Sequence, residues 1–312
     1  MVMTQFHQKI KFTNNMDWEE TFKSWGAAPG ITEQEKMENA ETSVRKAIAA
    51  NSTLAGMNIS IIPQGSYKSK TNVKNDSDVD ICVCLHSTFH DVYPVGKTRA
   101  EYGNVDGSTD FNSFKNLVQK ALEDYYGKNQ VTRGNKAFDI HSNTYRVDAD
   151  VVPAFAYRYY YGNSHNDYHQ PEGISFYTDD GKQVVNWPHQ TYSNCKDKHD
   201  NTGQRYRKMT RIIKRLRNKM QDENIAESKD IPSFLIQCMV HSAPNDYFNR
   251  STYTDDVRAV LVHCFNQTMS NGGHATLTEV NNMKYIFGGH QSCTREKAHA
   301  FFSKAWDYLG FE

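Results

Sequence analysis

The strand-forming segments of this chain all fall in its first part, and this order constrains the possible folds more than any other feature. Short β-rich segments bounded by turn residues predict five strands, at 59–62, 79–85, 145–152, 173–177 and 183–186, the third of them ending at Pro153. From about residue 202 the hydrophobic period is helical, which predicts helices at 203–221, 231–242, 253–268 and 294–308. Strands first and helices afterwards favour an α+β lobe followed by an all-helical lobe.

Two further helices are expected within the first lobe. Thr32 and Glu35 have the spacing of a capping box, which would open a helix running through about residue 50. A second helix is predicted at 111–126, whereas the segment 65–78 is rich in turn residues. The polar stretch 193–201 is the expected boundary between lobes. The predicted domains are therefore a catalytic core at 1–195 and a helical domain at 196–312.

The composition indicates a soluble globular protein of the cytoplasm. The 312 residues suit two lobes, and no stretch approaches the roughly 18 apolar residues of a membrane span. The N-terminus lacks the apolar core of a signal peptide, and none of the six cysteines lies in a C-x-x-C pair. Lys and Arg number 36, as do Asp and Glu, and this neutral balance argues against a protein whose main role is to coat nucleic acid.

Zinc binding and covalent catalysis are not favoured. Cys238 and His241, like the adjacent pair His263 and Cys264, lie on helices that are predicted to be buried, where core packing is the commoner role. The chain also lacks a G-x-S-x-G elbow for a serine nucleophile.

A pair of carboxylates at the start of the second strand carries the clearest chemical signal. Asp78 and Asp80 are two residues apart, so their side chains share one face of a strand. Close carboxylates repel each other unless a cation neutralises them, and Mg²⁺ prefers such oxygen ligands. The preceding Gly65-Ser66 turn offers backbone N–H groups and a hydroxyl to a phosphate.

A site for two metal ions needs a third carboxylate, and the strand 145–152 offers two. Asp148 and Asp150 are again two residues apart, and periodicity does not choose between them. Either one could instead pair with Arg146 or with a nearby lysine. Two ions about 3.5–4 Å apart that share carboxylates stabilise both the attacking and the leaving oxygen of a phosphoryl displacement.

The helix predicted around 205–219 is strongly basic. It contains eight basic residues and no acidic one, which is unusual because exposed helices normally mix charges of both signs. Arg207, Arg211 and Lys214 fall opposite an apolar stripe that includes Tyr206 and Ile213. These cations could bind a nucleoside triphosphate, or they could form a solvated face.

Together these motifs resemble the DNA-polymerase-beta-type nucleotidyltransferase superfamily. The resemblance rests on Gly65-Ser66, on Ser77-Asp78-Val79-Asp80 and on Asp150-Val151-Val152-Pro153-Ala154-Phe155. More narrowly, the chain resembles the branch that contains the oligoadenylate synthetases, cyclic GMP–AMP synthase and the bacterial cyclic-oligonucleotide synthases, or CD-NTases. A polymerase-beta-like mixed sheet with an N-terminal helix, an all-helical lobe and an active site in the cleft between them is therefore implied.

The resemblance also implies roles for particular residues. The metal ligands would be Asp78, Asp80 and Asp150, and they would hold two Mg²⁺ ions, for which Mn²⁺ could substitute. The donor phosphates would be held by Gly65, Ser66, Arg211, Lys214 and Ser233, and Phe234 would approach a base. Ser233 could instead serve only as a helix cap.

The implied activity is the joining of nucleoside triphosphates, chosen among ATP, UTP, GTP and CTP, into a cyclic dinucleotide or slightly larger ring, with release of pyrophosphate. Such a product would act as a second messenger in anti-phage defence by switching on a separate effector protein, without a membrane and without a requirement for nucleic acid. The alternatives are a nucleotidyltransferase that modifies RNA or a protein, and an RNA-activated synthetase of linear oligonucleotides.

Overall fold

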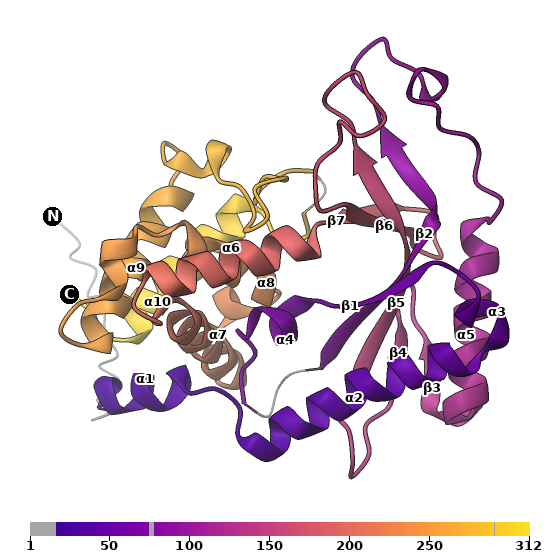
Figure 1. Ribbon diagram of the computed structural model, residues 1–312. Helices are drawn as coiled ribbons and strands as arrows, with labels where there is room; N and C mark the ends of the chain where they lie inside the picture. The colour runs from indigo at the N-terminus through magenta and orange to yellow at the C-terminus, as the bar shows by residue number, and fades with distance from the viewer. Residues whose placement is uncertain (1–16, 75–77, 290) are drawn as a thin grey trace, which may run out of the picture.

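We describe a computed structural model of the chain for residues 17–74, 78–289 and 291–312 (Figure 1). The expected absence of a signal peptide concerns residues that lie outside this range. A mixed sheet forms one side of the molecule and a cluster of helices forms the other (Figure 1). This arrangement confirms the predicted α+β lobe followed by a helical lobe.

The sheet contains seven strands in the order β1-β2-β5-β4-β3, with β6 paired to β5 and β7 paired to β6. Its central pair, β2 and β5, is parallel, and the other pairs are antiparallel. The strands are β1 Ile59–Pro63, β2 Val79–Val92, β3 Val131–Arg133, β4 Phe138–Ile140, β5 Ala149–Tyr159, β6 Gly173–Tyr177 and β7 Gln183–Asn186.

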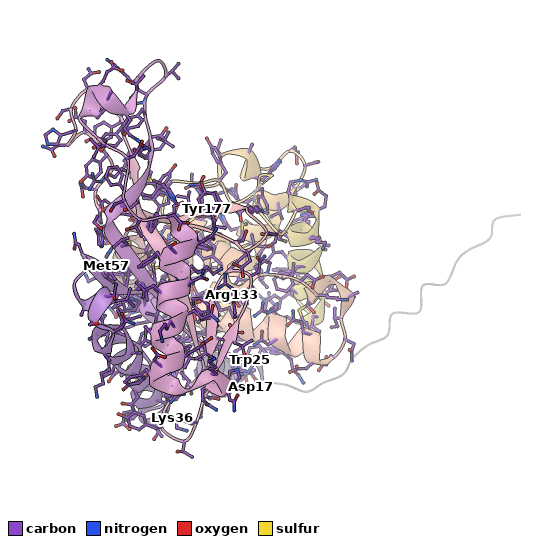
Figure 2. The ribbon with its side chains drawn as sticks, turned by 90° about the vertical axis from the view of Figure 1, so that its right-hand side faces the viewer. Asp17, Trp25, Lys36, Met57, Arg133 and Tyr177 are labelled. Atoms are coloured by element: carbon purple, nitrogen blue, oxygen red, sulfur yellow. The ribbon has the colours of Figure 1, made fainter. Side chains whose placement is uncertain are left out.

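Two long helices, α2 (Ile31–Ala50) and α5 (Phe111–Tyr126), cover one face of this sheet, and Figure 2 looks onto the molecule from the side of α5. The short α3 (Ser52–Ala55) follows α2. The buried residues of α2 include all four of the predicted stripe, Met37, Ala40, Val44 and Ile48. Because alternate residues of β2 face this core, the remaining residues of the strand, Asp80 among them, face the opposite side.

The helical lobe surrounds the basic helix α7 (Tyr206–Asp222). The first described helix, α1 (Trp18–Gly26), joins this lobe and buries Phe22 in its core. The predicted apolar stripe of α7 is confirmed, because Tyr206 and Ile213 are both fully buried. The other helices of the lobe are α6 Pro188–Asn201, α8 Ser233–Ser242, α9 Tyr253–Thr268 and α10 Arg295–Tyr308.

Short 3-10 helices connect several of these elements. They are η1 Arg99–Tyr102, η2 Lys128–Gln130, η3 Ala226–Ser228, η4 Asn245–Phe248 and η5 Gly273–Thr276. None of the described helices is both long and apolar enough to cross a membrane.

Several local predictions are wrong. The capping box does not form, since α2 begins after Gly30 and has no side-chain cap. Part of the turn-rich segment is the helix α4 (Gly65–Ser69), and residues 75–77 of that segment lie outside the described structure. Pro153 lies inside β5 rather than at its end. The strand tolerates it because β5 changes partner there, from β4 at Val151 to β6 at Phe155, so the lost N–H breaks no ladder on that edge.

Helix α6 and the strands β3 and β4 were not predicted. Helix α6 runs without a break through the polar stretch expected to separate the domains. The division at residue 195 therefore remains a prediction, and no irregular linker lies there.

Candidate active site

Neighbouring strands place three carboxylates in one row across the sheet. Asp80 on β2 is the direct cross-strand partner of Asp150 on β5, and Asp150 is also the partner of Asp139 on β4. Residues in register on neighbouring strands share a face, about 5 Å apart. Asp78 lies immediately before β2 and is close enough for its charge to affect both Asp80 and Asp150. The structure thus brings Asp78, Asp80 and Asp150 near one another, and these are the three carboxylates that were predicted from the sequence.

These carboxylates are held in an environment that disfavours their negative charge. Burial, followed by the charge of Asp78, raises the pKa of Asp80 to about 6. Burial, followed by the charge of Asp80, raises the pKa of Asp150 to about 7. Such repulsion between oxygen ligands is what a hard divalent cation relieves, so the donor set fits Mg²⁺.

The row does not form a finished metal cage. Among the described residues, no three His, Cys, Asp or Glu side chains converge on one point as metal ligands would.

Gly65 allows the backbone of α4 to approach this row. Its φ is +63°, and a Cβ atom there would lie 1.9 Å from Oδ2 of Asp80. Only glycine accepts both the left-handed backbone and this close approach. The amide of the preceding Gln64 also donates to the Asp80 carbonyl at 2.9 Å. Helix α4 is therefore fixed against the carboxylates by its backbone.

A pocket of about 340 Å³ opens beside this contact. Both lobes contribute to its wall: Gly65, Ser66 and Asp80 come from the sheet side, and Lys214, Ser233 and Phe234 come from the helical side. Predicted residues that are far apart in the sequence thus meet at one pocket, in the predicted cleft. The volume lies at the lower end of the range for small-molecule sites.

Lys214 is buried beneath α4 and does not belong to a solvated face. Only 3% of the residue is exposed, and its Nζ donates to the Thr71 carbonyl at 3.1 Å. Burial, followed by the charge of Arg217, lowers its pKa to about 8. A cation held in this way is ready to bind an anion in the pocket, because its own ligands are neutral.

Arg211 lies elsewhere. Its guanidinium donates to the carbonyls of Gly26 and Lys70, each at 2.8 Å, and it lines a different cavity from the pocket beside Asp80. The structure thus separates the two members of the predicted phosphate-binding pair, and the role of Arg211 toward phosphate remains a prediction.

Ser233 and Phe234 begin α8 at the edge of the pocket. The Ser233 hydroxyl accepts a hydrogen bond from Arg217 Nη2 at 2.9 Å. It makes no capping bond, and Pro232 occupies the N-cap position, so the structure gives no support to a role in capping alone. Phe234 is 40% exposed despite its apolar ring. An exposed aromatic side chain beside a polar pocket is suited to stacking on a base.

The structure distinguishes the two aspartates that periodicity left open. Asp150 lies in the carboxylate row, whereas the Asp148 carboxylate accepts a hydrogen bond from the Ser142 amide at 2.6 Å and lies at the surface. Arg146, the proposed partner of either one, donates to the His141 carbonyl and stacks on Tyr126.

Four residues around the site were not predicted to take part. Asp139 lies on a strand too short to show periodicity, and Arg217 was one of many basic residues in α7. Lys68 and Asn186 line the pocket, although neither belongs to a motif that was expected to bind nucleotide. The six cysteines are all free and buried, which confirms that Cys238 and Cys264 are core residues.

These features together define a nucleotidyltransferase. They are a mixed sheet with a carboxylate row, a Gly-Ser helix fixed against that row, and a helical lobe that supplies a buried lysine. A family model for the cGAS/DncV-like nucleotidyltransferase C-terminal helical domain matches residues 193–310. The cyclic dipyrimidine nucleotide synthase CdnE of Legionella pneumophila is 39% identical over 306 residues, which is 95% of this chain and 99% of the relative. The chain belongs to the cGAS/DncV-like family of nucleotidyltransferases, the CD-NTases, and its curated relatives include several cyclic dinucleotide synthases.

Two solved structures are also similar along almost their whole length. The Rhodothermus marinus CdnE c-UMP-AMP synthase, solved with Apcpp and Upnpp, has a TM-score of 0.81 and 28% identity, with coverage of 94% of this chain and 96% of that one. The Elizabethkingia meningoseptica CdnE cyclic dinucleotide synthase, solved with GTP and Apcpp, has a TM-score of 0.78 and 31% identity, with coverage of 94% and 99%. The predicted fold and enzyme class are therefore confirmed.

Proposed function

We propose that this enzyme joins two nucleoside triphosphates into a cyclic dinucleotide at the pocket beside the carboxylate row. The observation that carries the proposal is the register of Asp80 and Asp150 next to Gly65, because two carboxylates that could hold a metal ion lie beside a backbone that could hold phosphate. Asp78, Asp80 and Asp150 would hold two Mg²⁺ ions, or Mn²⁺ in their place. When bound, these ions would polarise the attacking hydroxyl and offset charge on the reacting phosphate.

The residues of the chain itself would position the donor nucleotide. Gly65 and Ser66 at the start of α4 line the pocket and would offer their N–H groups and the Ser66 hydroxyl to phosphate, while Lys214 would supply a positive charge from the helical lobe. Arg217 orients the Ser233 hydroxyl toward the same space. Contacts of this kind hold the α-phosphate in line with the attacking 3′-hydroxyl, and this orientation accounts for much of the catalysis in phosphoryl transfer.

Ring closure would repeat the same reaction after the linear intermediate has reoriented in the pocket, so that its free 3′-hydroxyl attacks its own α-phosphate. Asp80, with Asp150 as its neighbour on β5, lies beside this pocket, so both bonds would form there and each would release one pyrophosphate. Phe234 would stack on a base during both steps, since stacking tolerates any base.

The bases of the product are proposed to be pyrimidines. The relative with 39% identity is named a dipyrimidine synthase, whereas the two solved relatives were crystallised with purine or mixed nucleotides. Asn186 lines the pocket and offers both a donor and an acceptor, as the pairing edge of a pyrimidine requires. The product would serve as a second messenger of anti-phage defence in the cytoplasm, and a separate effector protein would bind it.

The test is a panel of incubations with each single triphosphate and each pair, with Mg²⁺ and without any polymer, followed by liquid chromatography and mass analysis. The proposal expects a cyclic product from UTP, CTP or both, and none from the Asp80→Asn variant. Cyclic products made only from purines would overturn the base assignment. A product that appears only when RNA or a protein acceptor is added would favour one of the alternative transferases.

A further inference from the structure

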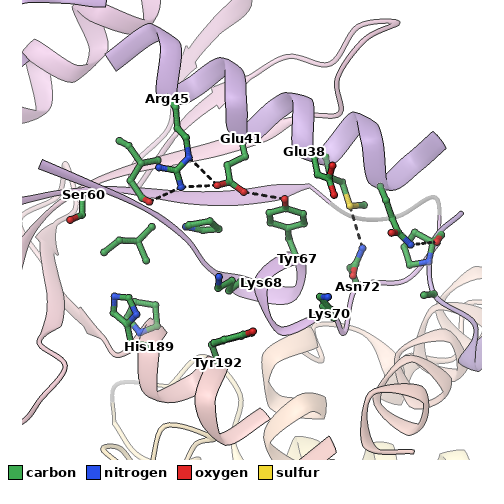
Figure 3. A pocket seen from close by; sticks show the side chains of 18 of the residues that line it. Glu38, Glu41, Arg45, Ser60, Tyr67, Lys68, Lys70, Asn72, His189 and Tyr192 are labelled. Carbon is green, nitrogen blue, oxygen red and sulfur yellow. Dashed lines mark hydrogen bonds and ion pairs between the residues drawn. The ribbon is translucent and has the colours of Figure 1, made fainter. Parts of the chain in front are cut away.

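A second cavity lies on the other side of α4 from the nucleotide pocket. It has a volume of about 780 Å³, more than twice that of the pocket, and it is bounded by α2, β1, α4, α6 and the side chain of Arg211 (Figure 3). This volume is within the range of sites that enclose a drug-sized ligand. The mechanism proposed above does not use it.

One short helix separates the two spaces. Gly65 and Ser66 line the nucleotide pocket, Tyr67 and Lys70 line the second cavity, and Lys68 lines both. Pro188, at the start of α6, is also common to both walls. A ligand in the second cavity would therefore contact the helix that holds the donor phosphates.

The charges in this cavity are divided between two walls. On the α2 side, Glu41 is satisfied by an ion pair with Arg45 at 2.7 Å and by the Tyr67 hydroxyl at 3.1 Å, as Figure 3 shows. Glu38 on the same helix has no ion-pair partner in the described part of the chain. The α2 wall thus offers one free carboxylate and a neutralised pair.

The opposite wall is cationic and aromatic. The Lys68 ammonium lies 4.6 Å from the centroid of the Tyr192 ring and has no carboxylate partner among the described residues. The Lys70 ammonium is exposed to the cavity, and the backbone carbonyl of Lys70 is fixed by Arg211. His189 completes this wall beside Tyr192, and burial, followed by the charge of Lys68, lowers its pKa. Two unpaired ammonium groups next to aromatic rings favour a ligand that carries both phosphate and a planar base.

We propose that this cavity binds a nucleotide that inhibits the enzyme, with the phosphate at Lys68 and Lys70 and the base against Tyr192. The ligand comes either from the enzyme's own cyclic product or from the pool of precursor nucleotides. Occupancy holds Lys68 in the second cavity, where its ammonium already lies near the Tyr192 ring, and keeps it from turning into the nucleotide pocket that it also lines, so affinity for the donor falls. The choice of nucleotides for testing this site rests on the proposed function, but the existence of the site does not.

Binding can be measured without turnover. Isothermal titration calorimetry of the full chain would use synthetic cyclic di-UMP as one probe and UMP as the other, with the nucleotide pocket saturated by a non-hydrolysable UTP analogue and Mg²⁺. One equivalent of probe should still bind. Lys70→Gln should weaken binding about tenfold by removing one charge-assisted contact, and Glu38→Gln should strengthen it severalfold by removing repulsion. Lys46→Gln, which alters an exposed lysine of α2 outside both cavities, is the matched control and should change nothing.

The opposite effects of Lys70→Gln and Glu38→Gln make the proposal falsifiable. Tight binding of cyclic di-UMP alone identifies the product as the source, and equal binding of UMP identifies precursor nucleotides. Complete displacement of the probe by the UTP analogue, indifference to both charge changes, or reversed signs would overturn the proposal, whereas a loss of probe affinity that levels off near fivefold is the reciprocal of the expected effect on KM. Binding of a short RNA in place of either probe would also overturn it. An inactive enzyme that still binds the probe would contradict the proposed function and leave this site intact.

The effect on catalysis provides a second measurement. Added cyclic di-UMP should raise the KM for UTP about fivefold or more in the unaltered chain and in Lys46→Gln, with less change in kcat. Tyr192→Ala, which lines only the second cavity, should abolish this inhibition while leaving the uninhibited KM unchanged. Unaltered inhibition in Tyr192→Ala would place the inhibitor at the nucleotide pocket instead.

Discussion

Replacing Asp80 with asparagine should stabilise the metal-free protein even though it removes activity. The pKa of Asp80 is raised from an ordinary value of 3.8 to about 6, mainly by burial and then by the charge of Asp78. The difference between these two pKa values corresponds to about 3 kcal/mol, which the folded state loses when this group ionises. Asparagine has nearly the same shape and no charge, so the variant recovers most of that free energy of unfolding at neutral pH.

The dependence on pH follows from the direction of the shift. A carboxyl whose pKa is higher in the folded state than in the unfolded state binds its proton more tightly when folded. Stability is therefore lost as pH rises from about 4 to about 6. The difference between Asp80→Asn and the unaltered chain should be close to zero at pH 4 and fully developed at pH 7.5.

Thermal and urea unfolding in the presence of EDTA at these two pH values would measure the effect. A gain of about 3 kcal/mol should raise the Tm at pH 7.5 by several degrees. Asp148→Asn is the matched control, because that carboxylate lies at the surface and accepts a hydrogen bond from a backbone amide, so its loss should give no gain. A loss of stability in Asp80→Asn at pH 7.5, or an equal gain at pH 4, would refute the electrostatic reasoning.

Three further predictions concern activity. Asp150→Asn should reduce turnover far more than Asp148→Asn, and the reverse order in a steady-state assay would show that the assignment of the third ligand is wrong. Lys214→Ala should raise the KM for nucleotide and lower kcat/KM about ten- to hundredfold, whereas Lys219→Ala, which breaks only an exposed ion pair, should cost much less; equal small effects would contradict the role of the buried lysine. Gly65→Ala should lose activity by at least about a hundredfold, because its Cβ would overlap the Asp80 carboxylate, and near-normal turnover would contradict the close approach.

Much of the site could be predicted because its residues belong to local patterns. The spacing of Asp78 and Asp80 reveals a shared strand face, and the basic helix is evident from its charge alone. Which of Asp148 and Asp150 joins them depends on cross-strand register, which periodicity does not contain. The resemblance to a family chose Asp150, and the observed register agrees with that choice.

Other features depend on contacts between distant segments. Lys214 and Arg211 are on one turn of α7, but the segment after α4 packs over this helix. As a result, Lys214 lines the nucleotide pocket and Arg211 lines the second cavity. Asp139 could not be found because a strand of three residues has no readable period. Helix α6 has few apolar residues, so its pattern is typical of a polar linker although it packs between the lobes.

The most direct test of cyclic dinucleotide synthesis is the structure of the product formed from protein, UTP, CTP and MgCl₂ alone. We expect a product that resists phosphatase, has the mass of a closed ring and forms with release of two pyrophosphates per ring. It should be absent when Asp80→Asn replaces the unaltered chain. A product that keeps a terminal triphosphate and is digested by phosphatase, or no product from any pair of triphosphates unless a polymer is added, would contradict cyclic dinucleotide synthesis at this site.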